Sequence, residues 1–118
     1  MRPAAVQFPY VPRDPDLGHA SLAPMLPLTL IGRQSASTSA LVDSGAAINV
    51  LPYLLGLQLG FEWDLQTNAV ELSGNLATVE ARVIIVSGVV GNFAPVRLAF
   101  AWAKTDQVST ILGQVNFF

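Results

Sequence analysis

The sequence lacks cysteine and has only one histidine, His19, among its 118 residues. Without cysteine the chain forms neither a disulfide nor a thiolate metal site. A zinc site built on histidine would need further histidines that the chain does not contain. A Ser-His-Asp triad would have to use His19, which lies in a proline-rich segment. These absences leave carboxylate chemistry as the enzymatic option, and we expect neither a metal nor another cofactor.

Charged residues are scarce as well, at 12% of the chain, and the net charge is −2. Because there is no basic stripe, we expect no nucleic-acid partner. No apolar run reaches the roughly 18 residues of a membrane span. Prolines and polar residues interrupt the N-terminal segment, so it does not have the pattern of a secretory signal. We therefore expect a cytoplasmic protein without a membrane span.

Hydrophobic residues, in contrast, make up 52% of the chain. A chain of this length forms one domain with a core of modest size. The excess of apolar residues indicates that some apolar surface is buried against another chain. Six of the eight prolines lie in residues 1–27, which we interpret as an extended N-terminal arm. The domain itself is expected at residues 28–118.

Short apolar segments separated by turn residues predict an all-β domain, either a barrel or a closed sandwich. The alternation of Val96, Leu98, Phe100 and Trp102 with other residues is the clearest strand pattern. Trp63, between two acidic residues, is expected to be partly exposed. Strands are expected at residues 28–32, 39–42, 48–51, 70–72, 76–80 continuing through 81–89, 96–102 and 110–112, a turn at 34–39, and a short helix or turn at 54–59.

The sequence Asp43-Ser44-Gly45-Ala46 places one carboxylate between two apolar segments. Burying an ionised acid without partners is costly, so this position needs a physical reason. One reason is ordinary turn chemistry, because Asp and Gly both favour turns. The other is a catalytic loop of the aspartic-protease kind, in which two neighbouring carboxylates hold one proton between them. The apolar flanks favour the catalytic interpretation.

Residues 41–46, Leu-Val-Asp-Ser-Gly-Ala, resemble the catalytic loop of the retropepsins, the retroviral-type aspartic proteases. Residues 111–114, Ile-Leu-Gly-Gln, resemble the apolar-apolar-Gly segment that precedes the C-terminal helix of that family. Residues 72–76, Leu-Ser-Gly-Asn-Leu, occupy the place of the family's flap tip. The resemblance covers about residues 27–118 and is to single-domain members of the bacterial type.

This resemblance implies the acid-protease fold, a closed β-barrel with a flap hairpin and one short C-terminal helix. It also implies a homodimer, because each chain supplies one catalytic loop and a two-fold axis places Asp43 against its own copy. In such a dimer, the Ser44 hydroxyl would tie the two loops together. Gly45 would donate its amide to the carboxylate, and Gly113 would let a second loop pass close beneath the first.

For function, the resemblance implies an aspartic endopeptidase that binds extended peptide or protein substrates as an added strand. The hairpin tip would close over the peptide and exclude water. Apolar residues on either side of the cut bond are expected. The implied substrate-binding residues are Ala46, Leu72, Ser73, Gly74, Asn75, Leu76, Ile111 and Gly113.

Two interpretations from other classes stay open. One is a non-catalytic retropepsin-like module that dimerises or binds extended peptides. The other is a structural β domain without a ligand, which would be a monomer. Retroviral members close their dimer with a strand after the C-terminal helix, whereas five residues follow Gly113 here. We therefore expect either that the chain has been cropped or that dimerisation relies on other contacts, with residues 1–27 as one candidate.

Overall fold

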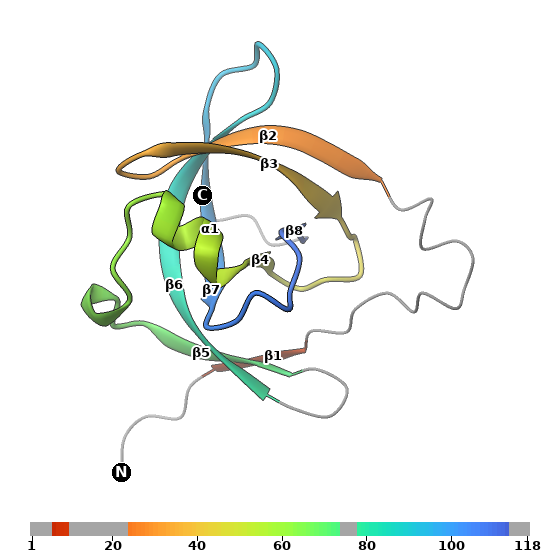
Figure 1. Ribbon diagram of the computed structural model, residues 1–118. Helices are drawn as coiled ribbons and strands as arrows, with labels where there is room; N and C mark the ends of the chain where they lie inside the picture. Colours follow the sequence, from red (N-terminus) through yellow and green to blue (C-terminus); the bar gives the residue numbers. More distant parts are fainter. Residues whose placement is uncertain (1–5, 10–23, 74–77, 114–118) are drawn as a thin grey trace.

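In the computed structural model, residues 6–9, 24–73 and 78–113 are described, and they form one mixed β-sheet (Figure 1). Its strands are β1 (Val6–Pro9), β2 (Met25–Ile31), β3 (Ser35–Val42), β4 (Asn49–Leu51), β5 (Ala69–Ser73), β6 (Thr78–Val89), β7 (Val96–Ala103) and β8 (Ile111–Leu112). Helical structure within these residues is limited to α1 (Tyr53–Gln58) and the 3-10 turn η2 (Trp63–Leu65). The expectation of a mostly β chain is confirmed. The helix expected after Gly113 lies outside the described residues.

The strand order in the sheet is β1-β5-β6-β2-β3-β8-β4-β7, and β7 also pairs with β6. This additional pairing brings β7, the last strand in the order, back against a strand near its beginning. β3 pairs in parallel with β8, and β4 pairs in parallel with β7. Since β8 also pairs antiparallel with β4, it lies between β3 and β4. This arrangement places β8 beside β3 and β4, although β8 is far from both of them in the sequence.

One expectation about a strand boundary was wrong. Residues 34–39 were expected to form a turn, but β3 begins at Ser35 and pairs with β2 along its length. The actual turn is tighter, closed by the Gly32 N–H donating to the carbonyl of Gln34 at 2.9 Å. Small polar residues suit β3 because much of this strand is exposed. The long strand expected at 76–80 and continuing through 81–89 is confirmed as β6 over its described residues, Thr78–Val89.

The core consists of two clusters, and β7 contributes to both. Phe100 and Trp102 belong to the first cluster, whereas Ala101 and Ala103 belong to the second. The alternation in β7 therefore separates large from small side chains, and both faces of the strand are covered. Such a strand fits the interior of a β fold, with a different packing layer on each side.

Trp63 was expected to be partly exposed, and that expectation was wrong. Its side chain is 7% exposed and packs edge-on against Trp102, with ring centroids 5.2 Å apart. Arg82 and Lys104 each place a cation 4.6 Å from the centre of the Trp63 ring. The acidic neighbours of Trp63 in sequence suggested exposure, but the 3-10 turn directs the indole into the core.

Candidate active site

Asp43 directly follows β3 and begins a tight turn. The Gly45 N–H donates to the Asp43 Oδ1 at 2.9 Å, and the Ala46 N–H donates to the Asp43 carbonyl oxygen at 3.0 Å. Asp43 is half-buried, while Ser44 and Gly45 are exposed. The turn thus orients one carboxylate oxygen through its own backbone and presents Ser44 and Gly45 to the surroundings.

Strand β8 supports this loop. The Asp43 N–H donates to the Leu112 carbonyl oxygen at 3.0 Å, and the Leu41 N–H donates to that of Thr110 at 2.8 Å. Val50 of β4 pairs with Ile111 on the other side of β8. The connection from β3 to β4 therefore passes around the end of β8, and the position of Asp43 depends on a strand almost seventy residues further along the chain.

Gly113 lies directly against the loop. A β-carbon at this position would be 2.5 Å from the Ile48 carbonyl oxygen and 2.7 Å from that of Ala46. Both neighbours are backbone atoms, which cannot rotate away as a flexible side chain would. The resemblance to the retropepsins implied that Gly113 lies close to the Asp43 loop. In the structure, Gly113 lies against the carbonyl groups of Ala46 and Ile48.

Asn49 is a polar residue of this region that the sequence analysis missed. Its side chain is 2% exposed. Its Nδ2 donates to the Ala99 carbonyl oxygen at 2.9 Å, and its Oδ1 accepts from the Gly113 N–H at 2.8 Å. The available signal was a lone amide within the apolar segment 47–51, because a buried polar side chain is nearly always hydrogen-bonded.

The other residues implied by the resemblance lie in different environments. Ala46 and Ser73 are half-buried. Leu72 and Ile111 are 0% and 4% exposed and pack in the second core cluster, so they support the Asp43 loop from the interior. The hairpin strands β5 and β6 pair as far as Ser73 and Thr78. The tip residues Gly74, Asn75 and Leu76 lie outside the described residues.

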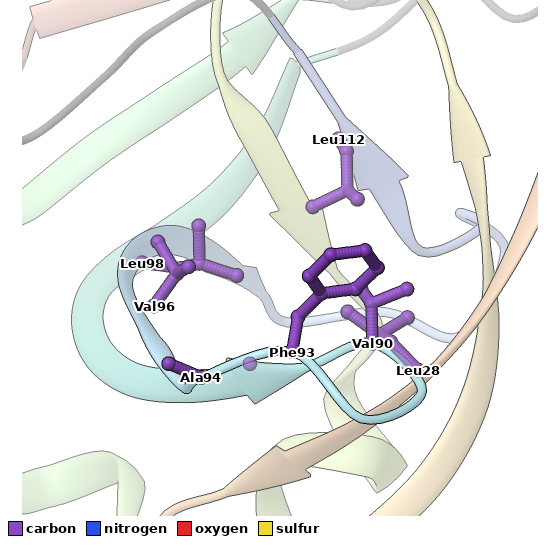
Figure 2. Close-up of a pocket in the computed structure, with 8 residues that line it drawn as sticks. Leu28, Val90, Phe93, Ala94, Val96, Leu98 and Leu112 are labelled. Carbon is purple, nitrogen blue, oxygen red and sulfur yellow. The ribbon is translucent and has the colours of Figure 1, made fainter.

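An apolar pocket of about 400 Å³ is lined in part by Leu112 of β8, whose carbonyl oxygen accepts from the Asp43 N–H (Figure 2). Phe93, which is 78% exposed, points from the β6–β7 turn toward Leu112 (Figure 2). The lining residues are Leu28, Gly88, Val90, Phe93, Ala94, Val96, Leu98 and Leu112. None of them has a titratable side chain, so this pocket supplies neither acid nor base, and the candidate active site is the Asp43 loop.

Across residues 6–9, 24–73 and 78–113, His, Cys, Asp and Glu form no group of three or more that would hold a metal ion. In the same residues no helix has the length and apolar character needed to cross a membrane.

No protein-family model and no curated protein matches this sequence. Among solved structures, the fold matches the crystal structure of a retropepsin-like aspartic protease from Rickettsia conorii, with a TM-score of 0.60. The chain has a retropepsin-like fold. The match covers 76% of this chain and 74% of the other, at 17% sequence identity. At this identity the similarity shows the fold, which agrees with the strand pattern expected from the sequence.

Proposed function

We propose that this chain is an aspartic endopeptidase that acts as a homodimer, a single-domain retropepsin of the bacterial type with a closed barrel. The observation that carries the proposal is the environment of Asp43. Its carboxylate accepts from the Gly45 N–H, and its own N–H donates to β8, within a retropepsin-like fold. In this proposal each subunit contributes one Asp43 to a shared site.

Peptide hydrolysis by carboxylates needs both a base and an acid. Two Asp43 carboxylates across a two-fold axis supply them by sharing one proton. The ionised group takes a proton from a bound water, and the protonated group donates its proton to the carbonyl oxygen of the peptide. The water oxygen attacks the carbonyl carbon and gives a tetrahedral diol. When the C–N bond breaks, the leaving nitrogen takes a proton, and one shared proton remains on the pair.

The exposed residues around the loop support a dimer interface at this point. Val42, directly before Asp43, is 39% exposed, and Met25 at the start of the neighbouring strand is 55% exposed. Large apolar side chains at such exposure gain free energy when a second subunit covers them. Ser44, which is exposed at the turn, would bond across the axis through its hydroxyl.

Substrate is proposed to bind as an extended strand beneath the β5–β6 hairpin, with apolar residues around the cut bond. Direct contacts are assigned to Ala46, Ser73 and the tip residues Gly74, Asn75 and Leu76. Because the side chains of Leu72 and Ile111 are buried, their contribution is to shape the wall behind these contacts.

The decisive experiment compares Asp43→Asn with the unchanged protein on an unfolded protein substrate, from acid to neutral pH. Asparagine keeps the oxygen that accepts from Gly45 but cannot act as a base. We expect the fold to persist and the cleavage rate to fall by at least about 10³-fold. Asp106→Asn is the matched control, because Asp106 also accepts from a backbone amide, that of Leu54 at 2.8 Å.

Full activity in Asp43→Asn would refute the proposal. If the unchanged protein dimerises and binds extended peptides without cleaving them, the result points instead to a non-catalytic retropepsin-like module. If it remains a monomer and binds no peptide, a purely structural domain is indicated.

A further inference from the structure

A single peptide group connects Asn49 to Asp43. The Gly113 N–H and the Leu112 carbonyl belong to the same peptide unit. Its N–H donates to the Asn49 Oδ1 at 2.8 Å, and its oxygen accepts from the Asp43 N–H at 3.0 Å. Because a peptide group is planar and stiff, a change in the position of one of these bonds moves the other.

The other end of this chain of hydrogen bonds is anchored in β7. The Asn49 Nδ2 donates to the Ala99 carbonyl oxygen at 2.9 Å, and Asn49 itself pairs with Phe100 in the parallel ladder of β4 and β7. Hydrogen bonds aligned in series polarise and strengthen one another in a protein interior. The Asp43 backbone is therefore tied through Asn49 to one of the most buried strands of the fold.

Only certain side chains meet the demands of this position. The residue must donate to a carbonyl oxygen and accept from an N–H at the same time, within a site that is 2% exposed. An amide has one group of each kind in a fixed arrangement. Leucine has a similar size but provides neither bond. An ionised aspartate would direct an acceptor at the Ala99 carbonyl, which is unfavourable.

We propose that Asn49 is a positioning residue for the catalytic carboxylate. It acts through the Leu112–Gly113 peptide and does not touch the substrate. This inference rests on the proposed function, since positioning is meaningful for catalysis only if Asp43 is the catalytic acid and base. Small displacements of a reacting group reduce the rate of the chemical step strongly. Because Asn49 acts on the position of the Asp43 carboxylate, it affects turnover more than substrate binding.

The test measures kcat and KM for Asn49→Leu per folded subunit. We expect kcat to fall on the order of 100-fold, with KM changing by less than about threefold. Asn49→Asp, assayed in acid where a buried carboxyl is protonated, again presents one donor and one acceptor. It should recover most of the lost kcat. As the pH rises and this carboxyl ionises, its activity should fall below that of the unchanged protein.

Leu59→Ala serves as a control for a merely structural effect, because Leu59 is fully buried in the first core cluster and follows α1, outside the strands β4, β7 and β8. It should lower stability while leaving kcat per folded subunit unchanged. If Asn49→Leu lowers kcat no more than Leu59→Ala does, or if Asn49→Asp matches the unchanged protein at every pH, the inference is wrong.

Amide hydrogen exchange separates this inference from the proposed function. Asn49→Leu should accelerate exchange at Asp43 and Gly113 beyond the change seen across β6, whereas Leu59→Ala should affect them no more than other core amides. This measurement does not depend on catalysis. An inactive unchanged protein would refute the proposed function and leave the exchange result valid. Unaltered protection at Asp43 in a folded Asn49→Leu variant would refute the link between Asn49 and the loop.

Discussion

Gly113 approaches Ile48 so closely that a β-carbon would lie 2.5 Å from the Ile48 carbonyl oxygen. This contact joins the end of β8 to the segment that leads from Asp43 into β4. The Gly113 N–H is held at the same time by Asn49. A change at Gly113 therefore acts on the Asp43 loop through the backbone, although the two residues are far apart in sequence.

Gly113→Ala should reduce the proposed peptidase activity more strongly than it destabilises the fold. The added methyl group must push the Ile48 and Ala46 carbonyls away, which typically costs about 1–3 kcal/mol in a tightly packed site. We expect a lower midpoint of thermal unfolding and at least about a 100-fold loss of kcat/KM, because the loop carrying Asp43 moves. Gly45→Ala is the comparison, since its β-carbon would be 3.3 Å from the Asp43 Oδ1, a smaller overlap. Equal activity in Gly113→Ala and the unchanged protein would contradict the prediction.

Val42→Glu should weaken the proposed dimer. Val42 is exposed beside the Asp43 loop, so a two-fold axis near this loop would bring two glutamates close together. We expect the dimer dissociation constant, measured by sedimentation, to rise at least about tenfold. Activity lost at low protein concentration should return at high concentration. Leu65→Glu is the control, because Leu65 is 63% exposed on η2, far from the end of β3 (Figure 1). If both variants dimerise like the unchanged protein, the interface lies elsewhere.

Gly56→Ala should destabilise the fold although alanine favours helices. Gly56 lies in α1, and a β-carbon there would be 2.1 Å from the Trp102 Nε1. Trp102 has little freedom to move, because this nitrogen donates to the Tyr53 carbonyl oxygen at 3.0 Å and the ring is fully buried. We expect the free energy of unfolding in denaturant to fall by about 2 kcal/mol, after the helix-propensity gain of about 1 kcal/mol. Gln58→Ala, at an exposed position of α1, should change it by less than about 0.5 kcal/mol. A stabilised Gly56→Ala would show that the indole shifts freely.

The rate of peptide cleavage should depend on pH as a bell with its maximum in acid. In the proposed dimer, cleavage requires one carboxylate as base and one protonated carboxyl as acid, so the rate should fall at any pH where either form is absent. The measurement is kcat/KM for one peptide across the acid range, and Asp106→Asn should leave both limbs in place. A rate that keeps increasing into the neutral range would contradict the shared-proton mechanism.

Much of the secondary structure follows from local sequence. The strands β2, β4, β5, β7 and β8 lie where apolar segments predicted them, and the helix α1 lies at the leucine-glycine segment near residues 54–59. These features depend on side-chain periodicity and turn chemistry within a few residues. The polar segment at the start of β3 and the buried Trp63 escaped prediction because pairing and packing with distant residues outweigh local preference there.

The features of the candidate site also fall into two groups, those predicted from the sequence and those set by the tertiary structure. The sequence identified Asp43-Ser44-Gly45 as an acidic turn between apolar segments, and the resemblance to the retropepsins pointed to Gly113 as its distant counterpart. Only the tertiary structure decided that β8 lies between β3 and β4, that Gly113 touches the Ile48 carbonyl, and that Asn49 connects β7 to the Leu112–Gly113 peptide. The physical reason is that each of these contacts joins residues about fifty to seventy positions apart. Local propensities carry no information about such pairings, which form when the sheet brings their backbones together.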